Sequence, residues 1–217
     1  MPESLKNLLK EIKYELTEKE KIQESCHENM RKATSLSKQA ILLGHQKRTA
    51  EAKNQLEKTK TLITNIRKSA KEHPALVYGG MFSAALQEYS EACIFLTLLE
   101  ECRFVTPEEI DVPSVDYVLG LADVVGEYRR LALDALREGD VKIGEECLRT
   151  MDEIYVELEG LDEAYVLVPG LRRKNDVARR IIEATRGDIT QEVRRKALED
   201  YLRQFEKRQR SRESDKS

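Results

Sequence analysis

Two glutamates stand inside an apolar segment of the chain. In AALQEYSEACIFLTLL (residues 84–99), Glu88 and Glu91 are almost the only charged residues. At about 100° per residue they share one helical stripe with Ala84 and Phe95, and a wider apolar stripe runs along the other side. A buried carboxylate must be protonated, paired with a base or bound to a metal ion. Because no Lys or Arg lies within a turn of either glutamate, we expect the partner to come from elsewhere in the chain, from another subunit or from an ion.

A second acidic pair follows about 30 residues later. In VDYVLGLADVVGEYRRLALDAL (residues 115–136), Asp123 and Glu127 are four apart and share one face of a helix. Gly120 and Gly126 flank this pair, at a cost of about 1 kcal/mol each relative to Ala, which indicates a close approach to the backbone. Asp116, Asp123, Glu127 and Asp134 form one acidic stripe of this helix, and a solvated polar face is the alternative interpretation of that stripe. Four carboxylates on two helices favour Mg²⁺ or Mn²⁺, which prefer oxygen ligands.

Positive charge is concentrated toward both ends of the sequence. The net charge is +6 over residues 1–75, −15 over 76–165 and +6 over 166–217. Basic ends around an acidic middle suit a protein that holds a polyanion, although helical bundles also segregate charge to pair their own segments. The candidate RNA-binding residues are Arg129, Arg130, Arg172, Arg173, Lys174, Arg179 and Arg180. For each of these, a surface charge or an intersubunit salt bridge is the alternative.

The composition and the spacing of turn residues predict an all-α fold. Ala, Leu, Glu, Lys and Arg dominate, with only 10 Gly and 5 Pro in 217 residues. We expect a single domain of about seven helices over residues 1–208 and a disordered polar tail over 209–217. The expected main helices are 4–43 with a break near Cys26, 49–71, 75–102, 113–138, 140–158, 171–186 ended by Gly187, and 190–209. Thr106 and Glu109 predict a capping box on a further short helix.

The environment of the chain is also constrained by its sequence. No run of about 18 apolar residues exists, so no membrane span is expected, and the N-terminal segment lacks a signal-peptide core. The four cysteines have neither zinc-site nor redox-motif spacing, which is typical of reduced cysteines in a cytoplasmic protein.

Two of these segments together resemble a known family. LQEYSEACIF followed by YVLGLADVVGEYRR is similar to the translin family, specifically to translin-associated factor X (TRAX) and its archaeal relatives. Weaker similarity extends through RKATSLSKQAILLGHQKR and LRRKNDVARR, so that it covers roughly residues 25–185. The resemblance implies a seven-helix fold that assembles into hollow octamers around nucleic acid.

The same resemblance implies an activity. TRAX-like subunits carry the acidic residues of a Mg²⁺-dependent endoribonuclease, whereas translin itself binds nucleic acid and lacks most of them. Because this chain has Glu88, Glu91, Asp123 and Glu127, we expect all four to be catalytic metal ligands in a homo-oligomer that cleaves RNA. The alternatives are a non-catalytic binder of single-stranded RNA or DNA, and a helical scaffold that binds no nucleic acid.

Overall fold

The computed structural model describes residues 5–72, 74–77, 79–161, 163 and 165–214. These residues form helices joined by turns, with no strand among them, so the predicted all-α class is confirmed. Internal contacts divide the chain into two compact units, Met1–Val124 and Val125–Ser217. The helices are α1 (Leu5–His45), α2 (Thr49–Glu72), α3 (Pro74–Val77), α4 (Gly80–Glu101), α5 (Pro107–Ile110), α6 (Ser114–Arg137), α7 (Val141–Glu159) and α8 (Leu171–Ser214).

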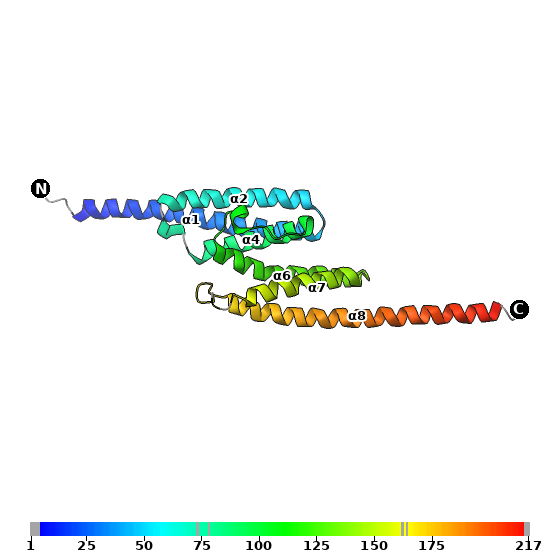
Figure 1. Ribbon diagram of the computed structural model, residues 1–217. Coiled ribbons are helices and arrows are strands. Elements are labelled where there is room, and N and C mark those ends of the chain that lie inside the picture. The colour runs from blue at the N-terminus through cyan, green and yellow to red at the C-terminus, as the bar shows by residue number, and fades with distance from the viewer. Residues whose placement is uncertain (1–4, 73, 78, 162, 164, 215–217) are drawn as a thin grey trace. The chain divides into compact units, whose positions relative to one another are not determined.

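The first unit is built on a hairpin of α1 and α2, with α4 packed against it (Figure 1). Lys47 takes the left-handed conformation (φ 59°) in the hairpin turn, where its amide donates to the Gly44 carbonyl. Gly44 also lets α1 approach α4, because a Cβ there would lie 2.7 Å from Leu96 Cδ2. The buried residues of α1 recur every three or four positions from Cys26 to Gly44, so the predicted break near Cys26 is wrong.

Helix α4 is the central element of this unit. Residues 89 to 96 are buried without interruption, which confirms the prediction that both faces of this helix are covered. The predicted helix over 75–102 is instead two helices, because Gly79 is extended (φ −172°) and forms the N-cap of α4. The connection to α6 contains the predicted capping box: the Glu109 amide donates to Thr106 Oγ1, and the Thr106 amide donates to the Glu109 carboxylate.

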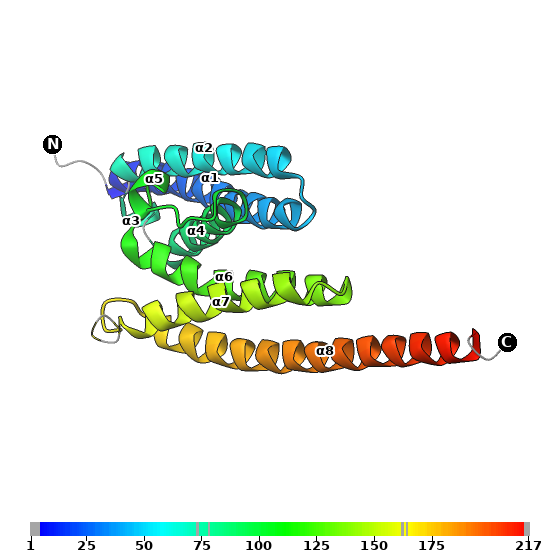
Figure 2. The same cartoon turned by 45° about the vertical axis from the view of Figure 1, so that its right-hand side comes forward.

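The second unit comprises the C-terminal half of α6 together with α7 and α8 (Figure 2). The Ile143 amide donates to the Asp140 side chain, which confirms the predicted cap of α7. Helix α8 packs its buried face, including Ala178, Ile182 and Ile189, beside α7. Arg186 on α8 forms a two-pronged ion pair with Asp152 of α7, with N–O distances of 2.9 and 3.0 Å.

Helix α8 is longer than the sequence predicts. It continues through Gly187, where we predicted a stop, and ends at Ser214 rather than near Gln209. The Thr185 and Thr190 hydroxyls each donate to the carbonyl four residues earlier, and Ile189 is buried just after the glycine. Packing on both sides of Gly187 therefore outweighs the cost of about 1 kcal/mol of a glycine in a helix. Residues 215–217 of the predicted tail lie outside the described residues.

The cysteines and the membrane prediction can also be checked. All four cysteines are free; Cys26, Cys93 and Cys147 are buried and Cys102 is exposed. Burial raises the pKa of Cys93 to about 12 and that of Cys147 to about 11, so both thiols stay protonated at neutral pH. Among the described helices, none is both long enough and apolar enough to cross a membrane.

Candidate metal and RNA-binding site

The glutamates on α4 have different surroundings. Glu91 is 9% exposed, within the continuously buried part of the helix. Glu88 lies nearer the surface, where its Oε1 is 3.1 Å from Lys38 Nζ of α1. Of the three sources of a partner that the sequence left open, the structure shows one elsewhere in the chain for Glu88. Because the Lys38 side chain is 62% exposed, this ion pair is partly screened by solvent and contributes little to stability.

The predicted close approach to α6 occurs at Gly120. A Cβ on this residue would lie 2.7 Å from the Gln87 carbonyl oxygen and 2.9 Å from the Glu91 amide nitrogen. No side chain larger than hydrogen fits there without movement of the α4 backbone. At Gly126, by contrast, nothing in the described part of the chain lies within 4 Å of such an atom. Gly120 therefore brings the part of α6 that carries Asp116 and Asp123 against the segment of α4 that carries both glutamates.

One turn before Gly120, Asp116 connects the same two helices. This aspartate is buried, and its Oδ1 accepts hydrogen bonds from Ser83 Oγ and, at 3.4 Å, from Gln87 Nε2. Gln87 Nε2 also donates to Ser83 Oγ at 3.0 Å. At its N-terminal end the acidic stripe is thus a buried helix contact, and the alternative of a solvated polar face is wrong there.

Asp123 and Glu127 continue this stripe beyond Gly120. At 100° per residue, both lie within about 60° of Gly120 on the helix wheel. Each is half-buried; Asp123 belongs to the first unit and Glu127 to the second. Within the described residues, no three His, Cys, Asp or Glu side chains gather closely enough to hold a metal ion. The structure thus brings the Asp123 and Glu91 segments into one helix contact, without a completed ligand group.

The donor chemistry nevertheless fits one class of ion. Glu88, Glu91, Asp123 and Glu127 offer only carboxylate oxygens, the donors that Mg²⁺ and Mn²⁺ prefer, and no sulfur or imidazole. Mg²⁺ commonly binds through one or two carboxylates and keeps several waters. An incomplete set of protein ligands is therefore compatible with such an ion.

The predicted RNA-binding arginines differ in their contacts. Arg129 is engaged within the second unit: its guanidinium donates to Thr185 Oγ1 at 2.7 Å and pairs with Asp188 at 3.2 Å. Arg130 is exposed. Arg172, Arg173, Arg179 and Arg180 are exposed on α8 and Lys174 is half-buried. The two arginine pairs recur after seven residues and so share one face of α8, but Asp176 and Glu183 lie on that face too.

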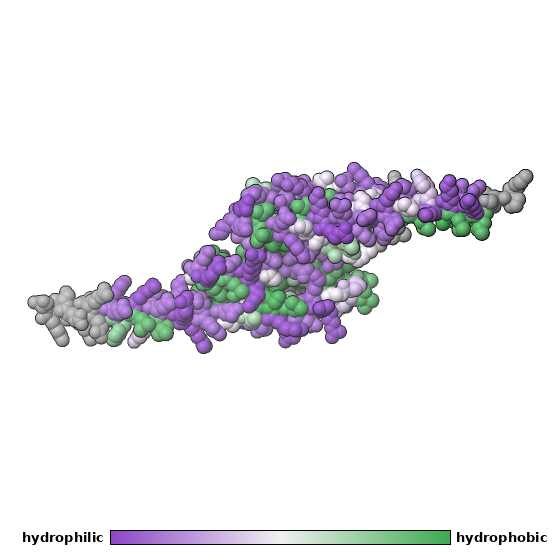
Figure 3. All heavy atoms as spheres, turned by 180° about the vertical axis from the view of Figure 1, so that it is seen from behind, coloured by the Kyte–Doolittle hydropathy of each residue, from purple (hydrophilic) through white to green (hydrophobic). Residues whose placement is uncertain are grey.

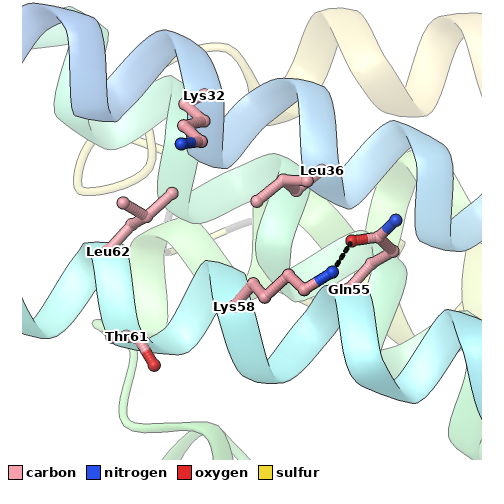
Figure 4. Close-up of a pocket in the computed structure, with 6 residues that line it drawn as sticks. All are labelled: Lys32, Leu36, Gln55, Lys58, Thr61 and Leu62. Carbon is pink, nitrogen blue, oxygen red and sulfur yellow. Dashed lines mark hydrogen bonds between the residues drawn. The ribbon is translucent and has the colours of Figure 1, made fainter.

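A separate groove lies between α1 and α2 (Figure 4). It has a volume of about 520 Å³, and its lining includes Lys32, Lys58 and Leu36. Lys58 Nζ donates to Gln55 Oε1 at 3.4 Å. Since its described lining residues include two lysines and no carboxylate, this groove is suited to an anion and is not the predicted metal site.

Sequence reasoning missed two polar contributors to the α4–α6 contact, Ser83 and Gln87. They are spaced by four residues and form one polar row on α4 with Glu91, four residues further on. On α6, Asp116 and Gly120 have the same spacing. Two rows of polar residues with the same four-residue spacing, one on each of two apolar helices, were the signal in the sequence that could have predicted this contact. Nothing in the local sequence indicated Lys38, because its contact with Glu88 joins positions 50 residues apart.

Known proteins are similar to this chain in sequence. A profile of the translin family matches residues 3–185, which include every helix of the first unit and both acidic pairs. The chain belongs to the translin family. An uncharacterized protein of Methanocaldococcus jannaschii is 33% identical over 128 residues, which is 58% of this chain and 57% of that protein. The chain thus spans little more than half the length of this curated relative.

Solved structures extend the similarity over more of the chain. The crystal structure of AfC3PO and that of its complex with duplex RNA are each 34% identical, with a TM-score of 0.74. Each match covers 85% of this chain, and 96% and 95% of the respective solved chains. The crystal structure of apo-NeC3PO is 23% identical with a TM-score of 0.76 over 85% of this chain and 96% of that one. This last similarity shows the fold alone.

Proposed function

We propose that this translin-family protein is a Mg²⁺- or Mn²⁺-dependent endoribonuclease of the TRAX-like type, acting as a homo-oligomer. The observation that carries the proposal is the contact at Gly120, which packs the part of α6 that carries Asp116 and Asp123 against the α4 segment bearing Glu88 and Glu91. Membership of the family and similarity to a protein solved with duplex RNA support RNA as the substrate.

The proposed roles follow from the position of each side chain. Glu91 and Asp123 hold the ion, and Glu88 and Glu127 complete or orient the ligand set. A bound divalent ion would polarise the phosphodiester and lower the pKa of a bound water. A carboxylate oxygen of this set accepts the proton of the attacking water. Lys38, which contacts Glu88, keeps a positive charge beside the carboxylates and can face a phosphate oxygen.

RNA binding is proposed for the exposed basic residues. Arg130 and the α8 residues Arg172, Arg173, Arg179 and Arg180 contact the phosphate backbone, with Lys174 beside them. Such contacts give weak sequence preference and strong dependence on salt. Arg129 is engaged by its contacts to Thr185 and Asp188, so we assign it to holding α6 and α8 together within the second unit.

Cleavage of a labelled RNA tests this proposal. We expect product with Mg²⁺ and none with EDTA, and a loss of at least about 100-fold in rate for Glu91→Gln and for Asp123→Asn. Glu100→Gln is the matched control, because Glu100 lies on the same helix but pairs with Lys53. Its rate should stay within about two-fold of wild type. Wild-type cleavage by either Glu91→Gln or Asp123→Asn would exclude the assignment.

A non-catalytic RNA binder is the second candidate. It is favoured by the ion pair of Glu88 with Lys38 and by the lack of a three-ligand group among the described residues. A gel-shift assay of the same RNA at low and high salt, with and without Mg²⁺, separates the two functions. Metal-independent binding with no cleavage in any divalent ion would support the binder and reject the nuclease.

A further inference from the structure

The N-terminal part of α1 presents an exposed apolar stripe. Leu5, Leu9, Ile12 and Leu16 follow a 4-3-4 spacing and so lie on one face of the helix, with exposed fractions between 41 and 69%. Here α1 extends beyond the end of α2 (Figure 1). We call this segment, residues 5–16, the α1 arm. A contiguous exposed apolar stripe on a helix marks an interaction surface.

The C-terminal part of α8 carries a similar stripe. Leu198, Leu202 and Phe205 follow a 4-3 spacing, with exposed fractions between 50 and 59%. This segment, residues 192–208, is the α8 arm, and it lies beyond the last residue matched by the family profile. Figure 3 shows apolar atoms, in green, beside the grey residues at each end of the chain.

The charges beside the two stripes have opposite sign. On the α1 arm, Lys6 and Lys13 directly follow the stripe residues Leu5 and Ile12. On the α8 arm, Glu199 and Glu206 directly follow Leu198 and Phe205. In heptad terms, all four charged residues occupy the same position beside the seam. When two helices pair antiparallel, equivalent flanking positions face each other, so these lysines would face these glutamates.

We propose that the α1 arm of one copy pairs antiparallel with the α8 arm of a second copy of this chain. The register that aligns both stripes sets Leu9 against Phe205, Ile12 against Leu202 and Leu16 against Leu198. In the same register, Lys6 lies beside Glu206 and Lys13 beside Glu199. The pairing covers the whole α8 stripe and three of the four residues of the α1 stripe with one contact.

Pairing of each arm with itself is less complementary. Two antiparallel α1 arms would set lysine against lysine, and two parallel ones would bring Glu15 near Glu20. Two antiparallel α8 arms would set glutamate against glutamate. Two parallel α8 arms would match Arg194 with Glu199, but that arrangement leaves the α1 stripe exposed to water.

The proposed contact is short, and it would link copies of this chain into an assembly. Three apolar layers are few for an isolated two-stranded coiled coil, so its strength depends on copies that are already held together. Because two different surfaces meet, the contact is heterologous, and it produces a closed ring or an open chain of copies.

Disulfide cross-linking between differently tagged copies tests the proposal. In a Cys102→Ser background, one chain carries Ile12→Cys and the other Leu202→Cys, and the co-expressed complex is mildly oxidised. We expect a mixed-tag disulfide dimer. The matched control replaces Ile12→Cys by Tyr14→Cys, which is exposed on the opposite face of α1 and should give no dimer. Cross-links only between two Leu202→Cys chains, or no cross-link, would overturn it. An intramolecular disulfide in a single chain that carries both Ile12→Cys and Leu202→Cys would also overturn it.

Charge reversal tests the register. Lys13→Glu should lower the cross-linked fraction by about five-fold, and adding Glu199→Lys to the second chain should restore it. Lys10→Glu makes the same change of charge away from the seam and should leave the fraction unchanged. Circular dichroism of each variant checks that the helices are intact. Equal losses for Lys13→Glu and Lys10→Glu, or no restoration by Glu199→Lys, would contradict the proposed register.

Discussion

Charged and polar side chains are used differently at the α4–α6 contact and along α8. At the α4–α6 contact they are few and buried or half-buried, and Asp116 accepts hydrogen bonds from Ser83 and Gln87 on the facing helix. Along α8 they are many and exposed, and several pair with neighbours on their own helix, as Arg195 does with Glu192 and Glu199. Burial makes each polar group depend on one partner, whereas exposure lets charges accumulate at little energetic cost.

The largest difference between the regions should come from Gly120. Gly120→Ala places a methyl group 2.7 Å from a backbone carbonyl oxygen, so we expect a loss of about 3 kcal/mol in the free energy of unfolding. Gly126→Ala on the same helix is the control and should stabilise by about 0.5–1 kcal/mol, since space is available there. Urea denaturation of both variants measures the difference. Equal stabilities would mean that α4 and α6 do not pack this closely.

The buried aspartate gives the next largest effect. Asp116→Ala leaves the Ser83 hydroxyl without its acceptor and removes one of the two acceptors of the Gln87 amide, so we expect a loss of about 2 kcal/mol in the free energy of unfolding. The exposed Asp176 of α8 is the matched position, and Asp176→Ala should change stability by less than about 0.5 kcal/mol. Thermal unfolding of the two variants under identical buffer conditions compares them. A larger loss for Asp176→Ala would invert the comparison.

Two adjacent arginines of α6 allow the same comparison between a side chain held by partners and an exposed one. Arg129→Ala removes the hydrogen bond to Thr185 and the ion pair with Asp188, so we expect a loss of about 1 kcal/mol in stability. Arg130→Ala should lose less than about 0.5 kcal/mol but weaken RNA binding at low salt. Denaturation and a gel-shift assay on each variant give both quantities. The reverse assignment would show that Arg129 serves RNA rather than the fold.

The smallest effect is expected within α8. Gly187→Ala removes a glycine from a continuous helix at a position with nothing described within 4 Å of the new methyl group, so it should stabilise by about 0.5–1 kcal/mol. A rise in melting temperature together with unchanged helical content would check this. A loss of helical signal would instead restore the stop that the sequence predicts at this glycine.

These regions also differ in how far the sequence predicted them. The apolar stripes of α4, the Thr106 capping box and the Asp140 cap depend on residues within one or two turns, and local patterns predict them well. The close approach at Gly120 was expected from a costly glycine inside a helix. The Lys38–Glu88 ion pair was not, because it joins positions far apart in the sequence. The four predicted metal ligands remain a prediction.

The errors have a common physical origin. The sequence predicts a helix end at Gly187 because glycine is unfavourable in a helix, but packing on both sides of it decides the outcome. The sequence also predicts that Gly79 and Gly80 lie within one helix, although Gly79 is the extended N-cap of α4. A glycine alone therefore does not predict a boundary, since contacts made by its neighbours outweigh about 1 kcal/mol of propensity.

Because α8 is a single unbroken helix, the direction in which the side chains at its C-terminal end point is fixed relative to its start. Each residue turns the helix by about 100° and lengthens it by about 1.5 Å. Removing one residue at Gly187 would swing Leu198 and its neighbours about 100° around the axis. Removing seven would shorten the helix by about 10 Å with a net turn of only about 20°. The number of residues in α8 alone thus sets how far this end extends and in which direction around the axis its side chains point. Loops inserted elsewhere cannot compensate for a change in either.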